Sequence, residues 1–322
     1  MRRPGCFGMV LALALLAVLF GVASSWMGAG PAEKELAVVV PNGATLSRAA
    51  TELEKAGAIR SAHRFLLFAR VLGSDAPIRA GEYQVPAHAS QSDVLELLQS
   101  GKVIQRLVAV PEGMPSVLVH EALMRAPHLT GTIAVPEEGS VLPDSYSYQR
   151  GDTRQEVLDR MQKAMRDYLA AAWKRRKPGA VVGSPQEALT LASIVEKETA
   201  KPAERRTVAA VYGNRLKQGM PLQADPTVIY PVTKGRPLGR RILRSELTAK
   251  NGYNTYASTG LPVGPIANPG RASIDAVLDP ASTSALYFVA DGSGGHVFAD
   301  TLEQHNANVQ KWYAIRRQRG EM

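Results

Sequence analysis

The chain has 322 residues, of which 45% are hydrophobic and 21% charged, a composition typical of globular proteins. This length exceeds the usual size of one domain, so we expect two soluble parts besides any targeting segment. The net charge of +9 suits nucleic acid, anionic lipid or an acidic polymer, but the sequence lacks zinc-finger spacing and interleaved aromatic and basic residues, which disfavours nucleic acid. The single cysteine, Cys6, excludes an intrachain disulfide and a multi-cysteine metal site.

The N-terminal residues have the pattern of a membrane anchor. Two arginines precede an apolar stretch from residue 6 to about residue 26, and the next charged residue is Glu33. This length is close to the roughly 20 residues that cross a bilayer as a helix. Positive charge before the stretch predicts a cytoplasmic N-terminus, a single pass through the membrane and an exported remainder. The alternative is a removable signal peptide, for which Gly21-Val22-Ala23 is a passable cleavage site, but the hydrophobic length favours the uncleaved anchor.

Residues 35–105 predict a compact α+β module. Hydrophobic periodicity and turn residues indicate the order strand, helix, helix, strand, helix. His63 and His88 stand alone in this region, and a lone histidine is more often structural or solvated than catalytic. We therefore expect the module to bind or to act as a spacer. Its segments are "ELAVVVPNGAT", "LSRAATELEKAGAI", "SAHRFLLFARVLG", "IRAGEYQV" and "SQSDVLELLQSG".

A connecting region extends from about residue 105 to residue 183. A strand and turn in "VIQRLVAVPEG" and a helix in "PSVLVHEALM" are followed by "PEEGSVLPDSYSYQRGD", whose tyrosines favour an ordered loop over a flexible linker. The next helix, "TRQEVLDRMQKAMRDYLAAAWKRRK", is amphipathic, and we expect it to pack on the following domain. Its apolar face carries Val157, Met161, Met165 and Leu169.

The next segment predicts a buried helix that carries two carboxylates. Ser184-Pro185-Gln186-Glu187 is a capping box with proline at the first helical position, and the helix extends to about Ala200. Apolar side chains cover most of its circumference, which is typical of a buried helix. Glu196 and Glu198 in the last turn would be largely desolvated, and burial and the negative end of the helix dipole both raise a carboxyl pKa. A carboxyl group that stays protonated near neutral pH suits a general acid.

The alternative interpretation is structural. Each glutamate would pair with a basic residue such as Arg205 or Arg206, and such ion pairs also shift pKa values. Helix geometry alone does not choose between these two interpretations.

Longer motifs resemble the MltG (YceG-like) family of endolytic murein transglycosylases. The resemblance covers nearly the whole chain and implies a mixed α+β fold with a transmembrane anchor (residues 1–30). A small LysM-like module (35–105) and a larger catalytic domain with a lysozyme-like helix (106–322) would follow it. We expect no cofactor and no metal. The matching segments are "VPEGM", "LPDSY", "LASIVEKETA", "GNRLKQGMPLQADPTVIY", "YNTYASTGLPVGPIANPG" and "LYFVADGSGGHVF", with "IRAGEYQV" in the LysM-like module.

The resemblance also separates the two glutamates. In lysozyme-like lytic transglycosylases the acid is a glutamate followed by Ser or Thr near a helix end. Glu198-Thr199 fits that pattern and Glu196-Lys197 does not. The resemblance therefore implies that Glu198 is the catalytic residue and that Glu196 supports the site by orienting a neighbour or by binding a basic partner.

The implied reaction cleaves the MurNAc–GlcNAc bond of peptidoglycan strands at the membrane, without water, and leaves 1,6-anhydro-MurNAc ends. One carboxyl group acts first as acid and then as base, since the nucleophile is tethered to the substrate. A non-catalytic peptidoglycan-binding scaffold and a hydrolase of the same polymer are the alternatives. Peptidoglycan is the expected ligand, and peptidoglycan synthases are possible protein partners.

The motifs also supply candidates for substrate binding, because amide, hydroxyl and aromatic groups suit sugar hydroxyls and sugar faces. For Asp225, a helix cap or a turn is an equally good interpretation. The "ALYFVADGSGGHVF" segment predicts a β-hairpin and lacks the Lys-Ser/Thr of a phosphate loop. His296 and His305 are too few for a zinc site. The candidates are Gln223, Asp225, Thr227, Tyr230, Tyr253, Asn254, Thr255, Tyr256 and Asn268.

Overall fold

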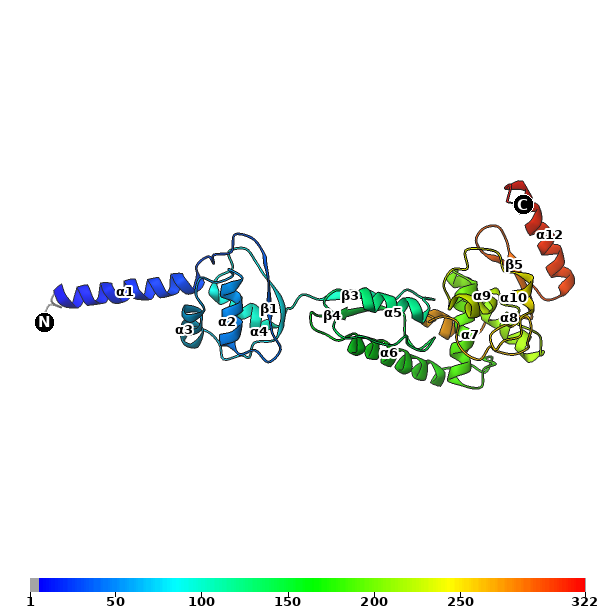
Figure 1. Cartoon of the computed structure of the whole chain (residues 1–322), viewed down its shortest axis with the longest axis horizontal. Helices are drawn as coiled ribbons and strands as arrows, with labels where there is room; N and C mark the ends of the chain where they lie inside the picture. The colour runs from blue at the N-terminus through cyan, green and yellow to red at the C-terminus, as the bar shows by residue number, and fades with distance from the viewer. Residues whose placement is uncertain (1–5, 322) are drawn as a thin grey trace. The chain divides into compact units, whose positions relative to one another are not determined.

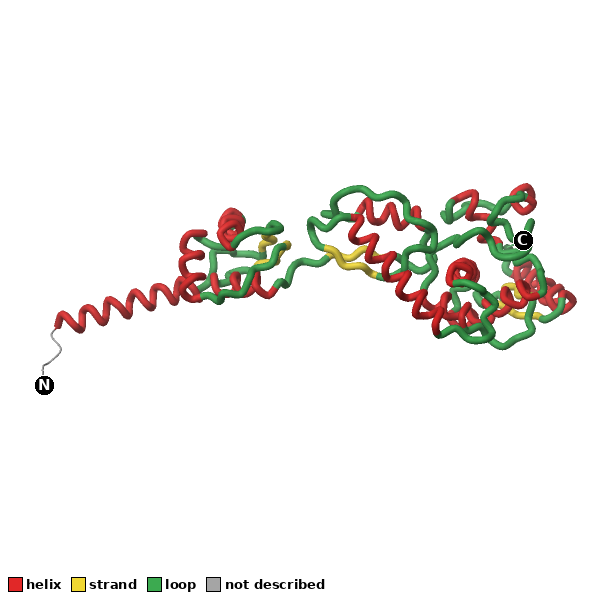
Figure 2. Tube along the Cα trace, turned by 90° about the horizontal axis from the view of Figure 1, so that it is seen from below, coloured by secondary structure: helices red, strands yellow, loops and turns green. Residues whose placement is uncertain are grey.

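The computed structural model describes residues 6–321 of the chain. It forms two compact units: unit 1 extends to Arg106 and includes residues 148–151, and unit 2 comprises residues 107–147 and the chain from Asp152 onward. The expected mixed α+β class is confirmed, since helices predominate and the described strands form three two-stranded sheets (Figure 2).

The first helix, α1 (Cys6–Met27), has 22 residues. A 20-residue part of it, Gly8–Met27, contains an 18-residue window that has a mean hydropathy of 2.3 and is not buried against the rest of the protein. Among residues 6–321 it alone is long and apolar enough to cross a membrane. Its length of about 33 Å matches the hydrocarbon core of a bilayer.

Unit 1 has the element order expected from the sequence. Thr45, Ser61 and Ser90 precede its three helices, and each side chain accepts a hydrogen bond from a backbone N–H in the first turn, which satisfies an otherwise unpaired donor. The two strands pair antiparallel, with Leu36 opposite Val85 and Val40 opposite Gly81. The elements are β1 (Leu36–Val40), α2 (Leu46–Lys55), α3 (Ala62–Leu72), β2 (Gly81–Val85) and α4 (Gln91–Ser100).

The first part of unit 2 contains the strand pair β3 (Arg106–Ala109) and β4 (Ser145–Tyr148) and the helices α5 (Ser116–Arg125) and α6 (Arg154–Lys174). A capping box between Thr153 and Glu156 starts α6. The predicted apolar face of this helix is directed inward, with Val157, Met161 and Met165 buried and Leu169 packed at the edge of the core.

The rest of unit 2 is built around α7 (Pro185–Glu198), which packs against α6, α8, α9 and α11 (Figure 1). The predicted hairpin is present as β5 and β6, with Tyr287 opposite Ala299 and Ala290 opposite His296. The remaining elements are η1 (Pro202–Glu204), α8 (Arg205–Lys217), α9 (Asp225–Thr233), α10 (Arg244–Thr248), α11 (Arg271–Leu278), β5 (Tyr287–Ala290), β6 (His296–Ala299) and α12 (Leu302–Gln318).

Candidate active site

The central helix α7 delivers two glutamates to the end of the hydrophobic core. Its start is fixed by the Ser184 hydroxyl, which accepts a hydrogen bond of 3.1 Å from the Glu187 N–H, and by Pro185 in the first turn. Every residue from Ala188 to Val195 is buried. Because the helix is held on all sides, the position of its last turn is set by the core.

Glu198 lies in that last turn, and its carboxyl group is desolvated. Burial raises its pKa to about 7, against a hydrogen bond from the Tyr212 hydroxyl that lowers the pKa. The nearby Asp225 raises this pKa and Arg215 lowers it, both by smaller amounts. Its Oε1 atom is buried and has no hydrogen-bond partner among the described residues. A carboxyl group in this state is protonated in a large fraction of molecules at neutral pH.

The carboxyl group faces two adjoining cavities. The first, of about 280 Å³, is lined mainly by polar and aromatic side chains. The second, of about 410 Å³, lies on the side of the β5–β6 hairpin and is lined by Glu198, Gly295, His296 and Trp312, among others. Glu198 therefore contributes to the lining of both cavities. The first cavity is lined by Glu198, Tyr212, Arg215, Leu222, Gln223, Asp225, Tyr256, Phe288 and His305.

Arg215 provides a fixed positive charge in the first cavity. Its side chain is 9% exposed, and its guanidinium donates to the backbone carbonyls of Leu286 (2.7 Å) and Leu222 (2.9 Å). These bonds hold the cation in place without neutralising it. The backbone of Gln223 adopts a left-handed conformation (φ 54°), which is uncommon for a non-glycine residue and is found most often at functional sites.

Glu196 has different surroundings. Its side chain is 6% exposed, and its Oε1 lies 3.6 Å from the Arg205 guanidinium. Its Oε2 accepts a hydrogen bond of 2.9 Å from the Gly270 N–H. It lines neither cavity that contains Glu198. The expected basic partner is thus present at Glu196, whereas the structure gives no ion pair within 4.0 Å for Glu198 among the described residues.

The structure brings three of the predicted substrate-binding residues to Glu198. Gln223, Asp225 and Tyr256 line the same cavity. The Tyr256 hydroxyl donates a hydrogen bond of 2.6 Å to the Asp225 carboxylate, which fixes both side chains. Asp225 is also the first residue of α9, so it begins the helix and faces the cavity at the same time.

Three further candidates hold loops together instead of facing the cavity. The hydroxyls of Thr227 and Thr255 are 2.8 Å apart and buried, and Thr255 also accepts a hydrogen bond from the backbone N–H that precedes Asp225. Asn254 is 1% exposed, and its amide donates to the carbonyls of residues 246, 247 and 249. The substrate contacts predicted for these side chains find no support in their placement.

The last three candidates lie apart from this cavity. Asn268 is fully buried, with its Oδ1 accepting from the Val141 N–H (3.0 Å) and its Nδ2 donating to the Met114 carbonyl (2.9 Å). Its placement gives a substrate no access to the amide. The Tyr230 ring lies 4.8 Å from the ring of the half-buried Tyr253, tilted by 51°, and Tyr230 lines a separate apolar cavity of about 560 Å³.

Sequence reasoning missed four residues around Glu198: Tyr212, Arg215, Phe288 and His305. Arg215 is part of the quoted "GNRLKQG" motif, and an arginine inside an otherwise buried helix is a usable signal. His305 stacks on Tyr287 at 5.2 Å, and burial together with Arg215 lowers its pKa. Phe288 is contributed by the hairpin, and no local pattern indicates that it meets α8.

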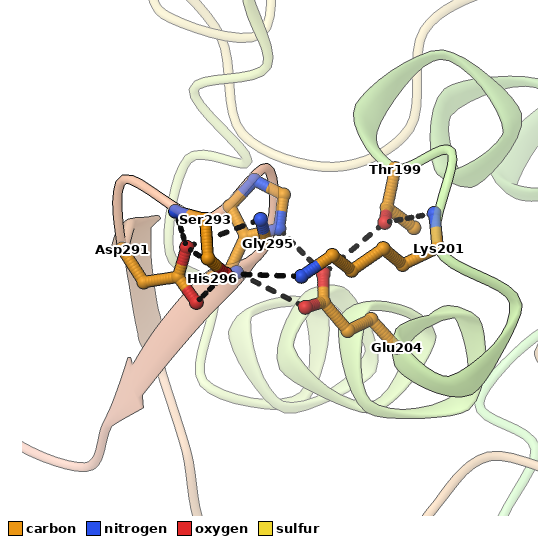
Figure 3. A network of polar contacts seen from close by, with 7 residues as sticks. All are labelled: Thr199, Lys201, Glu204, Asp291, Ser293, Gly295 and His296. Carbon is orange, nitrogen blue, oxygen red and sulfur yellow. Dashed lines mark hydrogen bonds and ion pairs between the residues drawn. The ribbon is translucent and has the colours of Figure 1, made fainter.

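A polar network fixes the hairpin to the end of α7 (Figure 3). Glu204 accepts hydrogen bonds from the Thr199 hydroxyl (3.2 Å) and from the His296 N–H (3.0 Å), and its Oε2 lies 2.7 Å from the His296 Nδ1. Burial raises the pKa of Glu204, but the bonds with His296 outweigh it, so the pKa is below its ordinary value. Thr199 directly follows Glu198, so this network keeps the hairpin wall beside the candidate acid.

Comparisons with known proteins identify the family of this chain. The pattern of the YceG-like family matches residues 38–311. A relative from Bacillus subtilis (strain 168), named endolytic murein transglycosylase, is 29% identical over 90% of this chain and 89% of its own. A protein of the same name from Streptococcus pneumoniae serotype 2 is 28% identical over 86% of this chain, which spans only 58% of that protein.

A solved structure of a YceG-like protein is also similar to this chain. The crystal structure of a YceG-like protein from Listeria monocytogenes matches with a TM-score of 0.51 and 26% sequence identity, over 86% of this chain and 99% of that one. The family pattern covers most of the chain, and the solved relative shares its fold. The chain therefore belongs to the YceG-like family.

Proposed function

We propose that this protein is a lytic transglycosylase that cleaves the MurNAc–GlcNAc bond of peptidoglycan glycan strands and leaves 1,6-anhydro-MurNAc ends. The relatives named endolytic murein transglycosylase support the substrate and the reaction class. The observation that carries the mechanism is the desolvated Glu198 carboxyl, whose pKa of about 7 and unpartnered Oε1 suit a proton donor in a cavity.

In this mechanism Glu198 acts twice. The protonated carboxyl donates its proton to the glycosidic oxygen while the bond from that oxygen to C1 of MurNAc breaks. The carboxylate then removes the proton from the C6 hydroxyl of the same sugar, and that oxygen bonds to C1 and closes the anhydro ring. The proton returns to Glu198 and water is not consumed. Because the nucleophile belongs to the substrate, proximity replaces much of the work of a second carboxylate.

The cavity residues support the charged transition state. The Asp225 carboxylate, held by Tyr256, provides negative charge for a sugar ring that becomes oxocarbenium-like. The amide of Gln223 offers hydrogen bonds to sugar hydroxyls. We propose that Tyr212 orients the Glu198 carboxyl and that Glu196 positions the loop before α11 through the Gly270 N–H.

The two units have separate tasks in this proposal. Helix α1 crosses the inner membrane once with a cytoplasmic N-terminus, as its length and the preceding arginines suggest. Unit 1 is a LysM-like module, and unit 2 is the periplasmic catalytic domain, in which α7 is the lysozyme-like helix. Peptidoglycan synthases are the proposed partners, because a membrane-anchored wall enzyme meets strands as they are made.

Mass spectrometry of sacculi digested by the full chain tests the proposal. We expect anhydro-muramyl ends from the unmodified protein, and loss of at least about a thousandfold in rate for Glu198→Gln, because the amide cannot donate the proton. Glu196→Gln is the matched control, and it should retain most of the activity. Free reducing ends would indicate a hydrolase, and intact strands would indicate a scaffold. If Glu196→Gln is inactive and Glu198→Gln is not, the two roles are reversed.

A further inference from the structure

The end of α1 is built into the core of unit 1. Trp26 is 6% exposed, and its ring lies 6.1 Å from Phe65 and 6.4 Å from Phe68, both on α3. The Gln91 amide of α4 donates a hydrogen bond of 2.6 Å to the Ser25 carbonyl. The apolar helix and the module are therefore in direct contact.

The residues that follow α1 are also fixed to the module by backbone hydrogen bonds. The Gly30 N–H donates to the His88 carbonyl (3.1 Å), and the His88 N–H donates to the Ala32 carbonyl (2.7 Å). No flexible linker separates the helix from the module. If α1 spans the bilayer, as the proposed function holds, unit 1 must lie directly on the membrane surface.

Helix α3 lies at the end of unit 1 where α1 joins it (Figure 1). One side of α3 carries Phe65 and Ala69 into the core. The opposite side exposes two large apolar residues, Leu67 (52% exposed) and Val71 (72%), and Leu72 (45%) is exposed at the C-terminal end of the helix. Apolar side chains exposed to water do not stabilise a soluble module. Exposed apolar patches of this kind mark contact surfaces.

The apolar row is accompanied by basic side chains. Arg60, Arg64 and Arg70 are exposed, and in the described part of the chain none of them has a carboxylate within 4.0 Å. Arg64 is spaced three residues from Leu67 and seven from Val71, so these residues share one stripe of the helix. Apolar side chains flanked by free arginines are typical of a helix that lies in the membrane interface.

We propose that the exposed face of α3 lies on the outer surface of the bilayer that α1 crosses. Leu67, Val71 and Leu72 insert at the boundary between headgroups and acyl chains, and the three arginines bind lipid phosphates. This contact adds a second attachment beside the anchor and fixes the orientation of unit 1 on the membrane. The proposal depends on the membrane span of α1 and is independent of the glycan chemistry.

The test places single fluorophores on the full chain in vesicles of mixed neutral and anionic phospholipids. Cys6 is the only cysteine, so Cys6→Ser gives a background for Leu67→Cys and Val71→Cys, each labelled with a polarity-sensitive dye. Val39→Cys is the matched control, because Val39 is also apolar and exposed (39%) but lies on β1, away from α3. Lipids with a spin label near the headgroup report contact by quenching.

We expect the dyes at residues 67 and 71 to shift to shorter wavelength and to lose most of their intensity to the spin-labelled lipid, while the dye at residue 39 stays water-exposed. Water-like emission at all three positions would overturn the proposal. So would a shift that depends on protein density or on added peptidoglycan and that the lipid does not quench, because a second copy or the wall would then cover α3.

Carbonate extraction separates this proposal from the proposed function. Protein that stays in the vesicles but shows no lipid contact at α3 refutes only the α3 surface. Protein that is extracted refutes the anchor, and the α3 proposal fails with it. Loss of glycan cleavage in sacculi, with the dyes still in lipid, refutes the transglycosylase assignment alone.

Discussion

Two carboxyl groups on one helix turn have opposite surroundings in this protein. Glu196 is neutralised by Arg205 and bound by a backbone N–H, whereas Glu198 keeps a buried oxygen without a partner among the described residues. The difference arises from the direction in which each side chain leaves α7, since residues two positions apart point about 200° apart around a helix. One is suited to hold structure and the other to transfer a proton.

The pKa of Glu198 predicts the pH dependence of the reaction. The group must be protonated to donate, so the rate should fall about tenfold per pH unit above its pKa of about 7 and should level off below it. The rate of release of anhydro products, measured between pH 5 and pH 9, tests this decline. The Glu196→Gln variant should show the same decline in rate above pH 7. A rate that stays constant up to pH 9 would contradict the assignment of Glu198 as the acid.

The same group predicts a pH-dependent cost in stability. The pKa of Glu198 is about 7 in the folded protein, against an ordinary value of 4.5 for a glutamate, so folding favours the protonated form. Its stabilising contribution is complete below pH 4.5 and is lost as the pH rises through 7, by up to about 3 kcal/mol.

Glu198→Gln removes this dependence. The free energy of unfolding of unit 2, measured with urea, should therefore be higher in the variant than in the unmodified chain at pH 8, and similar in both at pH 4.5. Equal stability at both pH values would show that the Glu198 carboxyl is not desolvated in the folded protein.

At the scale of elements, the catalytic helix and the hairpin depend on each other. The β5–β6 hairpin forms a wall of both cavities through Phe288 and His296, and Glu204 binds it to the residue after Glu198. Gly295 allows this close contact, because a Cβ at that position would lie 2.4 Å from the Glu204 carboxylate.

Removal of Glu204 should misplace the hairpin wall. We expect Glu204→Ala to lower kcat roughly tenfold, because the substrate is positioned less well. The pH dependence of the rate should stay the same, because Glu198 is intact. Asp300→Ala is the control: Asp300 binds Ser284 at the other end of the hairpin, at an exposed site, and its loss should leave kcat unchanged. Normal kcat for Glu204→Ala would show that the network does not position the wall.

At the scale of the whole molecule, the chain passes between its two units three times, at residues 106–107, 147–148 and 151–152. Two arginines of unit 1 lie beside these crossings: Arg106 at the first, and Arg150 in the segment 148–151 between the other two. Glu82 of β2 is 5% exposed and pairs with Arg106 at 2.8 Å and with Arg150 at 3.2 Å. Burial alone would raise the pKa of Glu82, but the two arginines lower it below its ordinary value. One buried carboxylate of unit 1 therefore holds both Arg106 and Arg150.

This arrangement predicts a protease-sensitive variant. Glu82→Gln removes the carboxylate that both guanidinium groups contact, so the chain around Arg106 and Arg150 should loosen and trypsin should cleave after these two residues several times faster. Glu52→Gln is the control, because Glu52 also pairs with two basic residues, Arg48 and Lys55, but at an exposed site. Unchanged cleavage rates at Arg106 and Arg150 would show that other contacts hold the crossings.

Local signals were sufficient for much of this architecture. The N-cap at Ser184 and the apolar periodicity after it are properties of short segments, so α7 and the burial of Glu198 could be predicted. The predicted capping box forms only in part, because the Glu187 carboxylate accepts a hydrogen bond from the Gly183 N–H and not from the Ser184 N–H. The placement of Asn268 could not, because its amide binds the backbone of Val141, 127 residues away. The same holds for Arg215, which contacts the Leu286 carbonyl across 71 residues. Motifs indicate which residues matter, and long-range packing decides which of them face the substrate.

The proposed proton donor and the surfaces around it come from different parts of the fold. Glu198 belongs to a helix locked in the core, whereas the residues opposite it come from the start of α9, the loop at Tyr256 and the β5–β6 hairpin. Substitutions in these outer segments can therefore change which cell-wall glycans bind in the cavities. The proposed acid would keep its position meanwhile, because its helix is part of the core. Enzymes descended from one ancestor would then differ in substrate specificity and share their reaction mechanism.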